Sequence, residues 1–158
     1  MEVIELTKAL ISCQSVTPKN DGVLDLLEKE LSNIGFDCSR YLFSDSNTPD
    51  VDNLFAKIGS GAPHICFGGH TDVVPVGDID AWSFDPFNAT EKDGKVYGRG
   101  ASDMKSAIAA FVCAVKEYIE NNELKGTVSL LITNDEEGPA INGTKKVLEE
   151  IYLSLIHI

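Results

Sequence analysis

The sequence predicts an α/β fold built on a mixed, mostly parallel sheet that is flanked by helices. Segments with apolar residues every three or four positions alternate with short, continuously apolar segments, which is the pattern of helices that cover a buried sheet. Residues 127–133 are nearly all apolar, which is typical of a strand buried on both faces. With 158 residues, of which 43% are hydrophobic and 24% charged, the chain has the size and composition of one globular domain.

The first half of the chain shows two amphipathic segments followed by three short apolar ones. Residues 2–12 and 22–34 each place apolar side chains at helical spacing, so we expect a helix over each. Gly35 follows the second helix and is a suitable C-terminal cap. We expect strands over residues 38–43, 53–58 and 64–68.

The second half begins with a long irregular segment and then alternates helix and strand. Residues 75–95 are rich in Pro, Gly and Asp, which indicates a loop, and a short strand is expected at 95–97. A long helix is expected from about Asp103 to Asn121, because apolar residues recur every three or four positions. The strand at 127–133 and a helix at 143–150 complete the pattern.

The charge and the cysteine content exclude several classes of function. A net charge of −12 and a pI of about 4.5 argue against nucleic acid and anionic membrane surfaces as partners, because both attract clustered Lys and Arg. No apolar segment is long enough to cross a bilayer, and the N-terminus lacks the features of a signal peptide. The four cysteines form no CxxC pair and lie in apolar surroundings, which indicates a reducing compartment, so we expect a cytoplasmic protein.

Five polar residues in three separate segments are candidates for a functional site. They are His70, Asp72, Asp103, Glu136 and Glu137. One imidazole and several carboxylates, delivered by the ends of different strands, are the ligand chemistry of a hydrolytic zinc site. A carboxylate often orients a zinc-binding histidine, and one of two adjacent glutamates can bind metal while the other acts as general base. The intervals from His70 to Asp103 and from Asp103 to Glu136 are both 33 residues, which favours convergence of the three segments.

Each candidate also has an ordinary structural interpretation. Asp72 is compatible with a turn after a strand, Asp103 with the N-cap of the following helix, and the two glutamates with a polar turn. These interpretations are favoured when each segment is considered alone, and the combination of segments favours the metal site. The chain contains no HExxH motif, phosphate-binding lysine loop or Gly-x-Ser-x-Gly elbow.

Three motifs of the chain resemble the M20 family of dinuclear zinc aminoacylases and peptidases. They are His-Thr-Asp-Val-Val-Pro at 70–75, Tyr-Gly-Arg-Gly-Ala-Ser-Asp-Met-Lys at 97–105 and Asp-Glu-Glu-Gly at 135–138, and the resemblance covers roughly residues 3–150. Within the family, Arg99 with Ala101 and Ser102 is more similar to the desuccinylases of bacterial lysine and diaminopimelate biosynthesis than to acetylornithine deacetylases.

The resemblance implies a role for each candidate residue. His70 would bind one zinc ion, Glu137 would bind the other, and Asp103 would bridge the two. Glu136 would be the general base, and Asp72 would orient the groups of the metal site. The implied cofactors are two zinc ions, with cobalt as a substitute, and the implied substrate is a small N-acylated amino acid. The implied reaction hydrolyses N-succinyl-diaminopimelate to succinate and diaminopimelate.

The chain also departs from the family pattern. The family has two further zinc ligands, a carboxylate and a histidine, beyond the last expected helix, and an inserted dimerisation domain. We therefore expect residues 1–150 to form the N-terminal part of the catalytic domain and residues 151–158 to be an anomalous apolar tail at a truncation point. His157 lies in that tail and is not expected to be a ligand. On this expectation the fragment alone is inactive and binds metal weakly, and only the full-length protein forms a homodimer.

Two alternatives remain open at this point. The first is another M20 deacylase or peptidase, such as acetylornithine deacetylase, because the sequence identifies no residue that contacts the substrate. The second is a non-catalytic, acidic α/β module that binds a metal or a protein partner, with its carboxylates serving structure.

Overall fold

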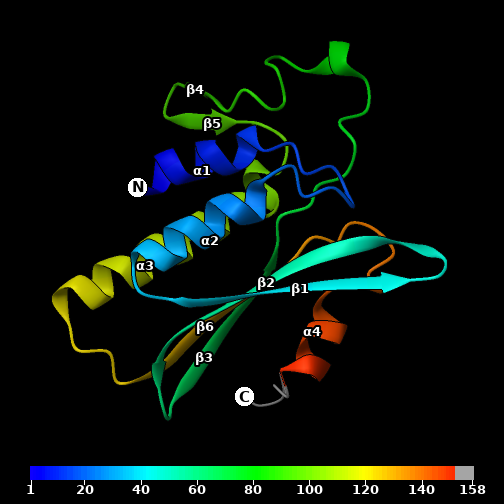
Figure 1. The fold of residues 1–158 in the computed structure, drawn as a ribbon. Coiled ribbons are helices and arrows are strands. Elements are labelled where there is room, and N and C mark those ends of the chain that lie inside the picture. Colours follow the sequence, from blue (N-terminus) through cyan, green and yellow to red (C-terminus); the bar gives the residue numbers. More distant parts are fainter. Residues whose placement is uncertain (152–158) are drawn as a thin grey trace.

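The computed structural model describes residues 1–151 and contains a mixed sheet between two layers of helix. The helices α1 (Val3–Ser12), α2 (Val23–Asn33) and α3 (Ser106–Asn121) lie on one side of the sheet, and α4 (Thr144–Glu150) lies on the other (Figure 1). The expected α/β class with flanking helices is confirmed. The expectations about the tail and His157 lie, apart from Ile151, outside the described residues. Within residues 1–151, no helix combines the length and the hydropathy that a membrane span requires.

The four strands of the sheet lie in the order β1, β2, β6, β3, with the bounds Asp37–Asp45, Thr48–Ser60, Gly126–Thr133 and His64–His70. β3 runs parallel to β6, whereas the β1–β2 and β2–β6 pairs are antiparallel. The sheet is mixed as expected, but the expectation of a mostly parallel sheet is wrong for the described strands. One reason is that only Ser46 and Asn47 separate β1 from β2, and strands joined by so short a turn must run antiparallel.

The hydrophobic core lies between the sheet and the three helices on its first side. Leu27 of α2 and Ile108 of α3 are fully buried there, in one cluster with Leu54 of β2 and Leu130 of β6. Apart from the start of α3, the helices form where the sequence predicts them, because the apolar residues that define the helical period are those that the core buries. Gly35 ends α2 with a φ of +96°, a conformation that favours glycine, which confirms it as the C-terminal cap.

The chain between β3 and α3 forms a lobe beside α1 (Figure 1). It contains the two-stranded sheet of β4 (Thr90–Lys92) and β5 (Lys95–Tyr97) and one turn of 3-10 helix at Ile79–Ala81. β5 is the expected short strand. The 3-10 turn and β4 are small regular elements within the segment that was expected to be a loop.

The long helix α3 begins at Ser106 and not at Asp103 as expected. Residues 101–105 form a wide turn in which Asp103 has φ −132° and ψ 99°, which is extended backbone. Gly100 permits the turn, because its φ is +78° and a β-carbon there would lie 2.7 Å from Val73 Cγ1. Asp103 therefore does not cap the helix, and an irregular turn presents its side chain.

Candidate metal centre

The parallel strands β3 and β6 bring two of the three candidate segments together at their carboxyl ends. His70 at the end of β3 is in register with Thr133 at the end of β6. The Thr71 hydroxyl donates a hydrogen bond of 2.9 Å to Asn134 Oδ1, and the Thr71 N–H donates one of 3.0 Å to the Thr133 carbonyl. The segments that follow the two strands therefore leave the sheet side by side, at the edge where α/β proteins place their sites.

His70 is 5% exposed, and both of its ring nitrogens face oxygen atoms. Nδ1 lies 3.0 Å from the Asp72 carbonyl oxygen and 3.5 Å from Asp72 Oδ1. Nε2 lies 3.1 Å from Asp103 Oδ1 and 3.8 Å from Glu136 Oε2. Burial disfavours the charged ring, but hydrogen bonds with Asp72 and Asp103 outweigh it and raise the pKa of His70 to about 9. Without metal, Nε2 therefore carries a proton that faces the carboxylates, in the position that a cation would take.

Asp72 is fully buried and fixes the backbone of the segment that follows β6. Its Oδ1 accepts a hydrogen bond of 3.2 Å from the Glu136 N–H, and its Oδ2 accepts one of 2.9 Å from the Glu137 N–H. Burial favours the neutral carboxyl group, but hydrogen bonds from His70 and from these two N–H groups outweigh it and lower the pKa of Asp72. Asp72 is therefore an anion that contacts the imidazole on one side and orders the glutamates on the other.

His70, Asp103 and Glu137 form a group in which one ligand atom of each residue lies within 4.8 Å of the other two. Within this group the Asp103 side chain is 75% exposed and Glu137 is half-buried, so the group is open to solvent on one side. Asp103 comes from the turn before α3, so the expectation that all candidates lie at equivalent strand ends is wrong for this residue. The Met104 sulfur accepts a hydrogen bond of 3.4 Å from the His70 N–H, which links that turn to the end of β3.

This donor set fits a divalent cation. His70 can offer Nε2, because its Nδ1 faces the Asp72 carbonyl, and Asp103 and Glu137 can offer carboxylate oxygens. Imidazole and carboxylate are ligands that zinc accepts, and zinc-binding histidines are commonly oriented by a carbonyl or carboxylate behind the ring. The structure thus brings the three predicted ligands together and places Asp72 and Glu136 beside them.

Sequence reasoning missed two buried residues that fix the segments around this site. Asp135 is buried, and its Oδ2 accepts hydrogen bonds of 2.9 Å from the N–H groups of Ile141 and Asn142, which fixes the loop after the glutamates. Nothing in the sequence distinguishes Asp135 from the two glutamates beside it. Lys105 is also fully buried, and its Nζ donates a hydrogen bond of 2.7 Å to the Cys13 carbonyl at the end of α1.

Comparison with known proteins agrees with this geometry. The model of peptidase family M20/M25/M40 matches residues 66–157. A curated succinyl-diaminopimelate desuccinylase of Parvibaculum lavamentivorans is 60% identical over 148 residues, which are 94% of this chain and 37% of that protein. One of Beijerinckia indica subsp. indica is 54% identical over 147 residues, which are 92% of this chain and 38% of that protein.

A solved structure shows the same architecture. An M20 family metallo-carboxypeptidase of Sulfolobus solfataricus superposes with a TM-score of 0.78 at 24% identity, over 95% of this chain and 34% of that one. At this identity the superposition establishes a common fold alone. The chain spans little more than a third of the length of the curated relatives that it matches.

Proposed function

The chain belongs to peptidase family M20/M25/M40, and from this membership we propose that its metal centre serves the hydrolysis of an N-acyl amide. The proposed substrate is N-succinyl-diaminopimelate and the products are succinate and diaminopimelate, because both curated relatives described above are named succinyl-diaminopimelate desuccinylase. Since the chain covers 37% and 38% of those relatives, the activity is proposed for the whole protein. A cytoplasmic location and a homodimer of the full-length protein remain predictions.

The convergence of His70, Asp103 and Glu137 is the observation that carries this proposal. M20 metallopeptidases generally bind metal ions, and these three residues offer the nitrogen and oxygen donors that such ions need. In this proposal His70 would hold one zinc ion, Glu137 would hold a second and Asp103 would be a ligand of both, with cobalt as a substitute ion.

The residues around the ligands have defined tasks in the hydrolysis. A bound divalent cation supplies polarisation of the amide carbonyl and a lowered pKa for water. Asp72 keeps the His70 ring oriented through its contacts with Nδ1. Glu136 lies 3.8 Å from His70 Nε2 with an exposed carboxylate, so it can take a proton from the attacking water. As the carbon–oxygen bond forms and the carbon–nitrogen bond breaks, Glu136 passes that proton to the leaving amine.

Calorimetric titration of the chain with zinc tests the metal centre. We expect His70→Ala to lose zinc binding and His64→Ala to retain it, because His64 is an exposed histidine at the start of β3. Equal zinc binding by the two variants would contradict the proposed ligands.

Hydrolysis assays with any longer protein that contains this chain test the reaction. We expect release of succinate from N-succinyl-diaminopimelate, loss of this activity after exhaustive chelation and its recovery when zinc is added. Hydrolysis that survives chelation would exclude a metal-dependent reaction. Faster hydrolysis of N-acetylornithine than of the succinyl amide would assign the protein to another deacylase of the same family.

A further inference from the structure

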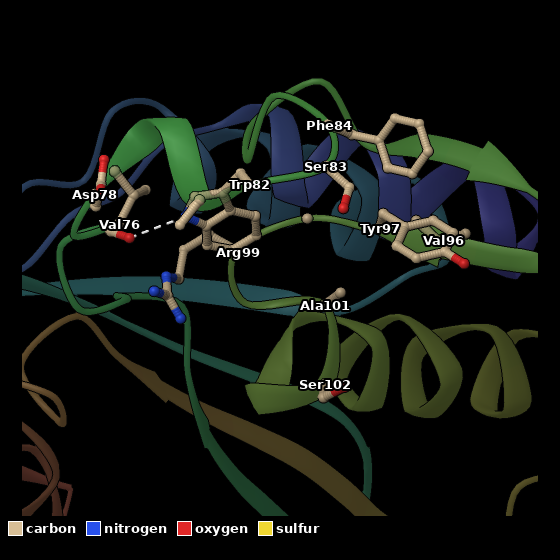
Figure 2. A pocket seen from close by; sticks show the side chains of 12 residues that line it. Val76, Asp78, Trp82, Ser83, Phe84, Val96, Tyr97, Arg99, Ala101 and Ser102 are labelled. Carbon is tan, nitrogen blue, oxygen red and sulfur yellow. Dashed lines mark hydrogen bonds between the residues drawn. The ribbon is translucent and has the colours of Figure 1, made fainter.

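A cavity next to the metal centre contains a guanidinium group that the proposed chemistry does not use. Figure 2 shows this cavity, which has a volume of about 530 Å³ and is lined by Trp82, Tyr97 and Arg99, among others. Arg99 also lines a second cavity of about 380 Å³, together with Asp103 and Glu137. One cationic side chain is therefore shared by the aromatic cavity and the cavity of the proposed metal ligands.

The guanidinium of Arg99 lies against an aromatic ring that is itself fixed. Arg99 Cζ is 5.1 Å from the centroid of the Trp82 ring, within the range of a cation–π contact. The indole Nε1–H of Trp82 donates a hydrogen bond of 3.0 Å to the Val76 carbonyl, drawn as a dashed line in Figure 2. A ligand would therefore meet a preorganised guanidinium, so little side-chain entropy is lost on binding.

Most hydrogen-bond donors of Arg99 are unused within residues 1–151. Among these residues, the Arg99 side chain donates a long hydrogen bond, 3.4 Å from Nη2 to the Pro75 carbonyl oxygen, and its Nε is buried without a partner. No carboxylate of the described residues forms an ion pair with it, and the Asp78 carboxylate in the same cavity accepts from the Asp80 N–H at 3.0 Å. A guanidinium offers five donors, and leaving buried donors unpaired is costly, so the site is suited to an anion supplied by a ligand.

We infer that Arg99 binds the free carboxylate of the substrate's acyl group and thereby selects a dicarboxylic monoamide over a neutral acyl amide. This inference rests on the proposed function, because a succinyl amide ends in such a carboxylate and an acetyl amide does not. A planar guanidinium pairs with a carboxylate through two parallel hydrogen bonds. Val73 and Val74 line the second cavity together with Arg99 and the proposed metal ligands, so apolar surface is available to the methylene groups that connect the carboxylate to the amide.

Trp82 is the single tryptophan of the chain, so its fluorescence reports on this cavity. The first experiment titrates the chain with succinate in the presence of a chelator, so that no metal ion can hold the carboxylate. We expect a saturable change of Trp82 emission with succinate and none with succinamide, which has the same length and no charge. Equal responses to the two compounds would overturn the inference, and so would binding of inorganic phosphate as tight as that of succinate.

Two substitutions test the side chain itself. Arg99→Gln removes the charge and should weaken succinate binding by roughly ten- to a hundred-fold. Arg99→Lys keeps the charge but lacks the paired donors, so its affinity for succinate should lie between those of the unchanged chain and Arg99→Gln. Lys145→Gln on α4 makes the same charge change at an exposed position and should leave binding unchanged. Unchanged succinate binding by a folded Arg99→Gln variant would overturn the inference. If that variant does not fold, the comparison of succinate with succinamide on the unchanged chain decides.

Hydrolysis assays separate this inference from the proposed function. Arg99→Gln should lower kcat/KM for N-succinyl-diaminopimelate by roughly ten- to a hundred-fold and leave that for an N-acetyl amide unchanged. Full metal-dependent hydrolysis of the succinyl amide by Arg99→Gln would overturn the role of Arg99 and leave the function standing. Succinate binding that depends on Arg99, in a protein that hydrolyses neither amide, would support the carboxylate site and overturn the function.

Discussion

The buried carboxylate of Asp72 accepts a hydrogen bond of 2.9 Å from the backbone N–H of Glu137. The same carboxylate lies 3.5 Å from His70 Nδ1. A single buried anion therefore contacts both the imidazole at the end of β3 and the backbone of the segment after β6. The relative positions of two proposed metal ligands depend on this residue, although it is not itself proposed to bind metal.

Asp72→Asn should weaken zinc binding by roughly ten- to a hundred-fold, the usual effect of changing a group that orients a metal ligand. The amide nitrogen of asparagine cannot accept a hydrogen bond, so the N–H of either Glu136 or Glu137 loses its acceptor. Calorimetric titration with zinc measures the effect. Asp37→Asn, at an exposed position of β1, is the matched control, and equal zinc affinities for the two variants would show that Asp72 does not order the centre.

Glu136→Gln and Glu137→Gln should change different properties, the rate of hydrolysis in the first variant and the zinc affinity in the second. Glu137 belongs to the ligand group, so its change should lower zinc affinity. Glu136 is proposed as the base, so its change should leave zinc affinity intact and lower kcat by roughly a hundred- to ten-thousand-fold. Zinc titration and a hydrolysis assay of both variants measure the two effects, and each variant controls for the other. Weakened zinc binding in Glu136→Gln with full affinity in Glu137→Gln would reverse the two assignments.

Local periodicity predicted the elements of the fold, but it did not predict the direction of the strands. The helices and β6 were found because their apolar residues are the ones that the core buries. β1 and β2 are longer than predicted and approach within two residues of each other, through polar residues such as Asp45 and Asp50. Aspartate is depleted in strands, so the β-propensity of these residues did not indicate the hairpin that makes this part of the sheet antiparallel.

The chemistry of the candidate site was more accessible to sequence reasoning than its geometry. Residue type and spacing selected His70, Asp103 and the Glu136–Glu137 pair, and the resemblance to the M20 family chose Glu137 of that pair as the ligand. The structure brings His70, Asp103 and Glu137 together. The extended backbone at Asp103 could not be predicted from the sequence. The spacing of apolar residues in the following helix extends without a break into residues 101–105, so the sequence pattern does not indicate a turn there. The contact between Arg99 and Trp82 could not be predicted from the sequence either, because it joins two irregular segments that have no periodic pattern.

Zinc affinity should rise with pH up to the pKa of His70. Burial lowers that pKa, but hydrogen bonds with Asp72 and Asp103 raise it to a net value of about 9. Zinc must displace the proton on Nε2, so below this pH the affinity should increase about tenfold per pH unit, with release of about one proton per ion near neutral pH. Calorimetry in buffers of different ionisation enthalpy measures the proton release. An affinity that stays constant from neutral to mildly alkaline pH would contradict a protonated Nε2, and His64→Ala should retain the full pH dependence.

Lys105 should make the protein more stable at alkaline pH than at neutral pH. Its side chain is fully buried, and burial lowers its pKa to about 8 from the ordinary value of 10.5. Between these two values the unfolded state binds more protons than the folded state, so the free energy of unfolding rises with pH. This increase in the free energy of unfolding is complete above pH 10.5 and is lost as the pH falls through about 8. The difference between the two pKa values corresponds to about 3 kcal/mol.

The substitution Lys105→Met isolates this contribution, because methionine fills similar space without a titratable group. Urea unfolding at a series of pH values should show that the free energy of unfolding of the unchanged chain, minus that of Lys105→Met, increases by about 3 kcal/mol between neutral pH and strongly alkaline pH. Lys57→Met, at an exposed position of β2, should show no such increase. A difference that stays constant with pH would mean that the Lys105 ammonium keeps its ordinary pKa in the fold, because burial would then impose no penalty on its charge.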